Sequence, residues 1–194
     1  INTNGLVGRA ERLGNVSYMQ QNDLLLPWRT VAGNCRLGLE LKGVGKAESN
    51  ERVERLAELF DIADVLDHMP WQLSGGMRQR VALLRAVLPD NLVLLLDEPF
   101  GALDAITRRS LQQWLLNVLD TADKAVVLVT HDVDEAILLA DRILVMAPEP
   151  GRIIADIKVD FEAKTDTEDI SMSLEFNKIR TNILHLLSHQ ESVR

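Results

Sequence analysis

Residues 92–99 read Leu-Val-Leu-Leu-Leu-Asp-Glu-Pro, and this stretch decides the fold. Five consecutive apolar residues are typical of a strand that is buried on both faces of a parallel sheet. Asp97 and Glu98 follow directly, and open α/β sheets bind their ligands just outside the carboxyl ends of such strands. The stretch therefore predicts a buried strand that ends at a ligand site, where one acid can hold Mg2+ and the other can activate water. A solvated turn after the strand is the alternative interpretation.

The sequence on either side of this stretch predicts further strands. Apolar runs occupy residues 125–129 and 143–147, and residues 16–20 form another candidate strand, which ends before Pro27. Residues 104–119 have the periodicity of a helix, which predicts a strand, helix, strand crossover and therefore an α/β fold with a parallel sheet. The apolar positions of that helix are Ile106, Leu111, Trp114, Leu115, Val118 and Leu119.

Residues 30–88 show only helical patterns, so we expect an all-helical insert to interrupt the sheet. Apolar side chains line one face of residues 51–60 and one face of residues 75–88. Nearer the end of the chain, a turn at residues 148–151 precedes a late edge strand at 152–160. Residues 171–190 predict an amphipathic helix whose apolar positions are Leu174, Ile179, Ile183, Leu184 and Leu187.

Composition narrows the classes of function. The 194 residues include 21 Lys and Arg against 29 Asp and Glu, so non-specific binding to nucleic acid is disfavoured and any phosphate site must be local. The single cysteine, Cys35, cannot form an internal disulfide, which suits a reducing compartment. No window approaches the roughly 20 apolar residues of a membrane span. The cysteine usage predicts a cytoplasmic protein. The first residues lack an initiator Met and the pattern of a signal peptide, so we interpret the start of the sequence as cut.

Two more segments carry residues that suit a phosphate ligand. Residues 73–80 read Leu-Ser-Gly-Gly-Met-Arg-Gln-Arg and predict a helix start with Ser74 as the N-cap. Gly75 and Gly76 would expose backbone N–H groups at the positive end of the helix dipole, which favours an anion, although a plain helix cap is the alternative. His131 follows the apolar run at residues 125–129, where a histidine can reach a phosphate or simply cap and pack.

Taken in order, five elements resemble the Q-loop, signature, Walker B, D-loop and switch histidine of ABC-type ATPases. They are Gln21, residues 73–80, residues 92–99, residues 101–104 and His131. We prefer Gln21 over Gln20 because Gln21 is in register with residues 27–28. The resemblance implies a P-loop NTPase-like parallel sheet core with an all-helical subdomain. The implied parts are an incomplete core with the Q-loop at 1–29, the helical signature subdomain at 30–89, the remaining core at 90–160 and a C-terminal helical tail at 161–194.

The resemblance also implies that ATP and Mg2+ are the cofactors. It assigns Asp97 and Gln21 to the Mg2+ site, Glu98 to the base that activates water, and His131 to a contact with the γ-phosphate. Two such subunits would close head to tail. Ser74, Gly75 and Gly76 would then bind the nucleotide held by the second ATPase subunit, and Asp104 would link the two sites.

Within the family, the chain is similar to the ATP-binding subunits of importers of the nitrate, sulfonate and taurine type. The similarity lies in residues 24–28, 77–80, 99–104 and 150–153. It implies that hydrolysis drives membrane permease subunits, which a substrate-binding protein supplies with solute. The subunit would lie peripherally on the cytoplasmic face of the membrane and would bind no nucleic acid. Residues 24–28 are expected either to pack on the helical insert or to dock on the permease.

The sequence departs from the family at one motif, because it contains no Gly-x-x-x-x-Gly-Lys-Ser/Thr phosphate loop. Residues 43–47 imitate only its end, since Ala47 replaces the hydroxyl residue, and we interpret them as a flexible loop before a helix. The simplest explanation is an N-terminal truncation, which would leave the chain inactive on its own. One alternative is a non-catalytic regulatory module. Another is a DNA-repair-type ABC ATPase, but the 53 residues from Gln21 to Ser74 are too few for its coiled-coil arm.

Overall fold

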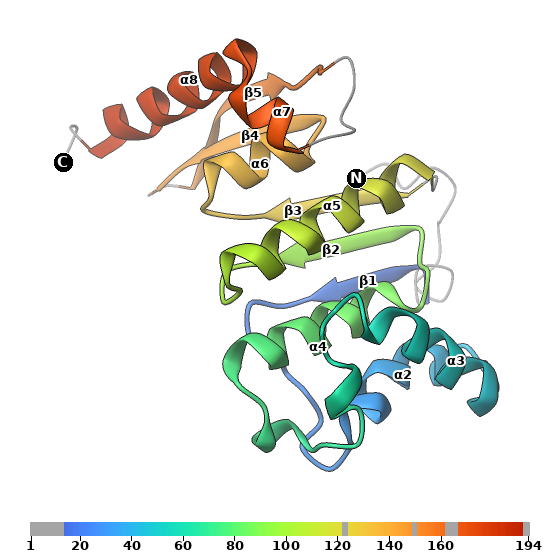
Figure 1. Cartoon of the computed structure of the whole chain (residues 1–194). Coiled ribbons are helices and arrows are strands. Elements are labelled where there is room, and N and C mark those ends of the chain that lie inside the picture. The colour runs from blue at the N-terminus through green and yellow to red at the C-terminus, as the bar shows by residue number, and fades with distance from the viewer. Residues whose placement is uncertain (1–13, 122–123, 149–150, 162–166, 192–194) are drawn as a thin grey trace. The chain divides into compact units, whose positions relative to one another are not determined.

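The computed structural model describes residues 14–121, 124–148, 151–161 and 167–191 (Figure 1). It contains two compact units, the first ending at Val129 and the second beginning at Thr130. The first unit holds a three-stranded sheet and a group of helices. The second holds a two-stranded sheet with its own helices.

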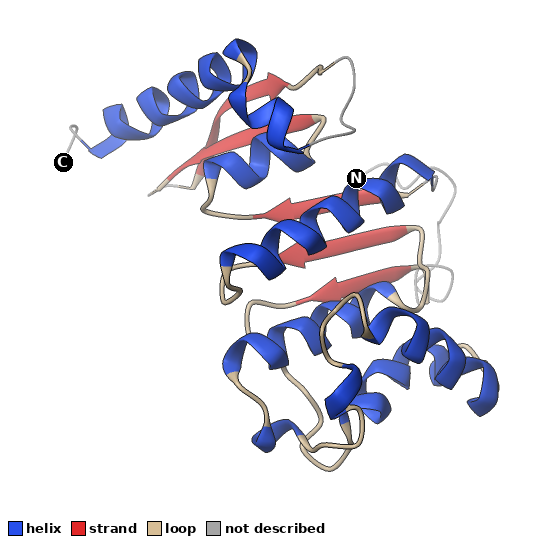
Figure 2. Ribbon diagram, viewed as in Figure 1, coloured by secondary structure: helices blue, strands red, loops and turns tan. Residues whose placement is uncertain are grey.

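The sheet of the first unit is parallel, as the sequence predicts. Its strands are β1 (Val16–Met19), β2 (Val93–Asp97) and β3 (Ala125–Val129), in the spatial order β1-β2-β3. Figure 2 shows their arrowheads pointing the same way. Met19 pairs with Leu96, and Asp97 pairs with Val129, so all three carboxyl ends meet at one edge of the sheet. The predicted α/β fold class is therefore confirmed.

Burial differs between the two long apolar strands. In β2, Leu94 and Leu96 are buried, as expected for a central strand. In β3, Val127 and Val129 are 55% and 54% exposed, so the prediction of burial on both faces is wrong for this strand. Exposed and half-buried residues alternate along β3, so one face of the strand is covered and the other face is open to solvent.

The region between β1 and β2 is all-helical, as predicted. It comprises α2 (Val31–Leu41), α3 (Lys46–Ala57), the short 3-10 turns η1 (Ala63–Val65) and η2 (Pro70–Gln72), and α4 (Gly75–Val87). Helix α2 packs on both α3 and α4. The interpretation of residues 43–47 as a loop is partly wrong, because Lys46 and Ala47 already belong to α3. The residues that begin this helix are polar or small good helix formers, so apolar periodicity does not reveal them.

Helix α5 (Ala105–Thr121) connects β2 to β3 and confirms the predicted crossover. Its buried positions include Leu111 and Leu115. The ring of Trp114 meets Phe60 edge to face, with centroids 5.1 Å apart, and this contact joins α5 to the helical region. Ile106 was expected on the same apolar face, but it is 81% exposed because it lies in the first turn of the helix, ahead of the packed positions.

The second unit contains α6 (Val133–Leu139), β4 (Arg142–Ala147), β5 (Arg152–Lys158), α7 (Thr167–Met172) and α8 (Leu174–Glu191). The apolar run at residues 143–147 forms β4, but β4 pairs antiparallel with β5 and is not part of the parallel sheet. Leu144 and Met146 point to its exposed face, while Ile143 and Val145 point into the core. The predicted late edge strand is confirmed as β5.

The C-terminal helix is broken where the sequence predicts one continuous helix. Its two parts, α7 and α8, are separated at Ser173, whose Oγ accepts a hydrogen bond from the N–H of Phe176 at 3.0 Å. The buried face contains Phe176, Ile179 and Ile183, whereas Leu174 is 81% exposed. Ser173 thus caps the start of the second helix. Across the described ranges, no helix combines the length and apolar content that spanning a membrane requires.

Candidate functional site

The carboxyl edge of the parallel sheet brings together residues that are far apart in the sequence. Asp97 ends β2 and Glu98 follows it, while Gln21 lies two residues beyond the end of β1. Because β1 and β2 are neighbours in parallel register, their following loops leave the sheet side by side. Gln21 and the Asp97–Glu98 pair therefore lie at the same edge, as the sequence predicts for a ligand site.

The backbone at Glu98 is fixed in an uncommon conformation. Its φ angle is 49°, in the left-handed region that residues other than glycine rarely adopt. The Glu98 N–H donates to the carbonyl oxygen of Val129 at 2.8 Å. The Glu98 carbonyl oxygen accepts from the side-chain amide of Gln79 at 2.7 Å and from the N–H of Gly101 at 3.4 Å. Hydrogen bonds with Val129, Gln79 and Gly101 therefore hold the backbone of Glu98 in place.

The turn at residues 74–76 begins α4 as expected. Ser74 is the N-cap, because its Oγ accepts a hydrogen bond from the N–H of Met77 at 3.2 Å. Ser74 and Gly75 are exposed. A Cβ atom on Gly76 would lie 3.1 Å from the carbonyl oxygen of Ala102, so this turn packs closely on the segment after β2. The structure thus brings Gly76 against Ala102, within the predicted segment 101–104.

Asp104 caps helix α5. Its Oδ1 accepts hydrogen bonds from the backbone N–H groups of Ile106 at 3.1 Å and Thr107 at 3.0 Å. Donation from Thr107 is the main reason that the pKa of Asp104 lies below its ordinary value. The residue is exposed, and its described contacts are those of a helix cap.

His131 lies in the second unit, between β3 and α6, and it is exposed. The sequence also allowed a helix-capping role for His131, but the neighbouring Asp132 has that role. Asp132 is the N-cap of α6, and its Oδ1 accepts from the N–H groups of Asp134 and Glu135 at 2.9 and 3.1 Å. The cap at this position is therefore filled by Asp132.

Sequence reasoning missed the contacts that hold the loop after Gln21. Arg78 and Arg85 of α4 both donate hydrogen bonds to Asp23, and Arg85 also donates to the carbonyl oxygen of Leu24. The only signal was two arginines seven residues apart on one helix, which points to a shared face but not to a partner. In the same loop, Leu24 and Trp28 are 52% and 71% exposed, whereas Leu25 is buried. The alternative that the whole segment packs on the helical insert is thus wrong for Leu24 and Trp28.

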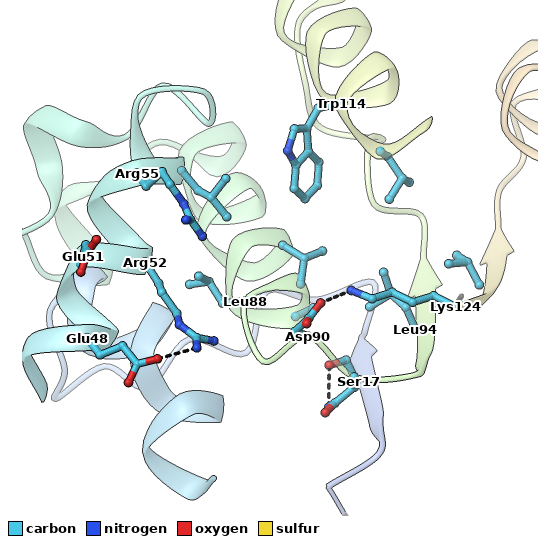
Figure 3. A pocket seen from close by; sticks show the side chains of 16 residues that line it. Ser17, Glu48, Glu51, Arg52, Arg55, Leu88, Asp90, Leu94, Trp114 and Lys124 are labelled. Carbon is cyan, nitrogen blue, oxygen red and sulfur yellow. Dashed lines mark hydrogen bonds and ion pairs between the residues drawn. The ribbon is translucent and has the colours of Figure 1, made fainter. Parts of the chain in front are cut away.

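A cavity of about 570 Å³ lies at the opposite end of the same sheet (Figure 3). Its lining includes Ser17 near the start of β1, and Asp90 and Lys124 just ahead of β2 and β3. Lys124 pairs with Asp90 and holds the pKa of that carboxyl below its ordinary value, and Arg52 pairs with Glu48 at 2.5 Å. Two ion pairs thus lie within the lining, and none of the predicted site residues lines this cavity.

The predicted acids suit a metal ion that arrives with a phosphate ligand. Within the part of the chain that is described, no three His, Cys, Asp or Glu side chains cluster as they would around a metal held by protein alone. Mg2+ is commonly held by one or two carboxylates, and water and phosphate oxygens complete its octahedron. Two adjacent carboxylates with a nearby amide, Asp97, Glu98 and Gln21, are oxygen donors of that kind. The oxygen donors of these three residues therefore fit magnesium that is bound together with a phosphate ligand.

Comparison with known proteins agrees with this arrangement. A family model described as ABC transporter matches residues 3–101. The taurine import ATP-binding protein TauB of Pseudomonas putida is 48% identical over 141 residues, which are 73% of this chain and 54% of that protein. TauB of Rhizobium johnstonii is 40% identical over 178 residues, or 90% of this chain and 68% of that protein. The chain thus spans about half the length of several curated relatives that it matches.

A solved structure shares the fold. The ATP-binding cassette MJ0796, described as a dimer in a post-hydrolysis state bound to ADP and Pi, superposes with a TM-score of 0.70 at 30% sequence identity. The match covers 76% of this chain and 64% of that one. The family model, the identity to ATP-binding proteins and the shared fold lead to the same conclusion: this chain belongs to the ABC transporter family.

Proposed function

We propose that the protein is the ATP-binding and ATP-hydrolysing subunit of an ABC importer, with Glu98 as the base that activates water. The observation that carries this proposal is the turn after β2. Its backbone hydrogen bonds hold Glu98 at φ 49°, directly beside Asp97 at the carboxyl edge of the sheet. Holding such a residue there costs conformational energy, and strain of this kind is typical of functional sites.

Each residue at the edge has a separate task in this mechanism. Asp97 and Gln21 hold Mg2+ through their side-chain oxygens, directly or through water. When bound, Mg2+ neutralises charge on the β- and γ-phosphates. Glu98 orients the attacking water and accepts its proton, and His131 contacts the γ-phosphate.

The turn at Ser74–Gly76 acts on the nucleotide of a second subunit. Ser74 and Gly75 are exposed, and backbone N–H groups at the start of a 13-residue helix favour an anion. The similar cassette MJ0796 was solved as a dimer with ADP and Pi, which supports a pair of subunits, and we propose that the pair closes head to tail. Asp104, beside this turn, links the two sites of the pair.

The solute belongs to the class of nitrate, sulfonates and taurine. The relatives named as taurine import ATP-binding proteins support this class at 40–49% identity. The permease docks on the exposed side chains of Leu24 and Trp28, and a substrate-binding protein supplies the solute. The subunit lies on the cytoplasmic face of the membrane. Vesicles that contain the permease and this subunit are tested for uptake of labelled taurine and of labelled nitrate, which distinguishes the two solutes. The proposed class is contradicted if neither solute is taken up.

Substitution of Glu98 in the full-length protein tests the hydrolytic role. Glu98→Gln keeps the shape and the backbone hydrogen bonds but removes the base, so we expect ATP binding to persist and turnover to fall by about 10²-fold or more. Glu54→Gln is the matched control, because Glu54 is an exposed residue of α3 that has no role in the proposed site. Turnover of the Glu98 variant close to that of the control would remove Glu98 from the mechanism.

A further inference from the structure

Helix α4 is attached by its side chains to both loops that carry hydrolytic residues. The helix begins with the Ser74–Gly76 turn. Farther along, Arg78 and Arg85 hold the loop after Gln21, and Gln79 holds the turn at Glu98. One rigid element thus touches three parts of the proposed site.

The contact with the loop after Gln21 is made mainly through its backbone. The Nη2 atom of Arg85 donates to the carbonyl oxygen of Asp23 at 2.6 Å, and Nη1 donates to that of Leu24 at 2.8 Å. The Nε atom of Arg78 donates to the carboxylate of Asp23 at 2.9 Å. Leu24 is in the left-handed region with a φ of 43°. The two arginines therefore hold this loop in a conformation that it would rarely adopt alone.

Arg85 is suited to this task by its chemistry. The guanidinium presents several N–H donors in a planar fork, so a single side chain reaches two successive carbonyl oxygens. The residue is half-buried, and desolvation lowers its pKa from the ordinary value. A lysine has one nitrogen and cannot span both carbonyls in the same geometry. The contact of Arg85 with the loop therefore depends on the planar shape of the guanidinium, and not on charge alone as in an exposed ion pair.

The other end of the same loop is also fixed. Asn34 of α2 is fully buried. Its Oδ1 accepts from the N–H of Leu26 at 2.7 Å, and its Nδ2 donates to the carbonyl oxygen of Leu26 at 3.1 Å. Residues 23–26 are thus anchored at two points, and Gln21 stands two residues before the first of them. An anchor this close limits where the Gln21 backbone can go.

The contact with Glu98 has the same character. Gln79 follows Arg78 in α4, and its amide donates to the carbonyl oxygen of Glu98 at 2.7 Å. The bond reaches the backbone carbonyl of Glu98 and not its side chain. The orientation of α4 therefore affects the backbone positions of both Gln21 and Glu98.

We infer that Arg78, Gln79 and Arg85 are positioning residues, which set Gln21 and Glu98 relative to the signature turn. The inference rests on the proposed function for the hydrolytic roles of Gln21 and Glu98. The attachment itself is a property of this chain and can be tested without ATP.

Hydrogen exchange measures the attachment directly in the full-length protein without nucleotide. Arg78→Gln and Arg85→Lys remove donors to the loop, so we expect amide exchange in residues 22–26 to become about tenfold faster or more, while α3 is unchanged. Arg52→Gln is the control, since Arg52 pairs within α3, with Glu48. If the Arg85 variant fails to fold, Arg78→Gln and Asp23→Asn still test the attachment of this loop, because Arg78 and Asp23 form a half-exposed ion pair. Unchanged exchange in these variants overturns the inference.

Steady-state kinetics test the consequence for hydrolysis. Gln79→Ala and Arg78→Gln should lower kcat by about tenfold with KM for MgATP little changed, because they displace catalytic groups and not the nucleotide. Arg78→Lys, which keeps the charge facing Asp23, should recover part of kcat. Loss of stability with kcat unchanged in the folded fraction would assign these residues a structural role only and overturn the inference. If the unaltered protein has no ATPase activity, the proposed function fails, while the exchange experiment still decides the attachment.

Discussion

Gly76 lies so close to Ala102 that a Cβ atom on the glycine would be 3.1 Å from the alanine carbonyl oxygen, whereas a Cβ on the adjacent Gly75 would meet nothing nearer than the Arg78 Nη2 atom at 3.9 Å. The two glycines of the signature turn therefore have different reasons for lacking a side chain. Gly76 is required by packing inside this chain. Gly75 faces open space, where we propose that the partner's nucleotide binds.

Alanine substitutions of these two glycines should separate stability from activity. Gly76→Ala pushes against a backbone atom, so we expect it to be less stable than Gly75→Ala by roughly 1–3 kcal/mol in urea unfolding. Gly75→Ala should fold normally and yet lower ATPase turnover of the full-length protein, because the methyl group obstructs the phosphate. Equal stability of the variants, or full turnover in Gly75→Ala, would contradict this division.

Replacement of His131 tests its contact with the γ-phosphate. The cap of α6 is made by Asp132, so His131→Ala should leave the start of this helix intact. Turnover of the full-length protein should nevertheless fall by about 10²-fold. Calorimetry and phosphate release measure folding and turnover on one preparation. A variant with normal turnover would show that His131 has no part in the reaction.

Trp28 should matter for transport more than for folding. It is 71% exposed, so Trp28→Ala should impair solute uptake while leaving the melting temperature and basal ATPase activity close to their original values. Leu25→Ala is the control within the same loop, because Leu25 is buried and its truncation should cost roughly 2–5 kcal/mol of stability. A fall in melting temperature for Trp28→Ala equal to that for Leu25→Ala would favour the packing interpretation.

The cap at Asp104 predicts a pH dependence. Its pKa is lowered in the folded chain, so its contribution to stability is complete above the ordinary Asp pKa of about 3.9 and disappears as the pH falls through the lowered value. Asp104→Ala should therefore lower the melting temperature at pH 7, and the difference should shrink toward pH 3. Asp104→Asn keeps an acceptor oxygen that does not titrate. If the melting temperatures of the unaltered protein and the Asp104→Ala variant differ by the same amount at every pH, the carboxylate is excluded as the source of that difference.

The features that the sequence predicts well are those encoded by neighbouring residues. An apolar run followed by Asp97 and Glu98 specifies β2 and its acidic end, and Ser74 before two glycines specifies a helix cap. The contacts of Arg78 and Arg85 with Asp23 were missed because 55 and 62 residues separate the partners. Local periodicity does not report on such distances.

Two other differences arise from pairing and packing that a single segment does not show. The runs that form β3 and β4 look alike in sequence, but β4 pairs antiparallel with β5 and alternates between buried and exposed residues. In the C-terminal region, the Oγ of Ser173 caps a new helix, and the apolar face passes through Phe176 and not through Leu174.

Trapping of an ATP-bound dimer tests the central proposal most directly. In the full-length Glu98→Gln variant, ATP and Mg2+ should bind between two subunits and remain intact, so light scattering should report a stable pair with ATP and single subunits with ADP. The unaltered protein should form the pair only transiently, because hydrolysis at Glu98 releases it. A variant that stays monomeric with ATP while it continues to release phosphate at the original rate would contradict both the shared site and the role of Glu98.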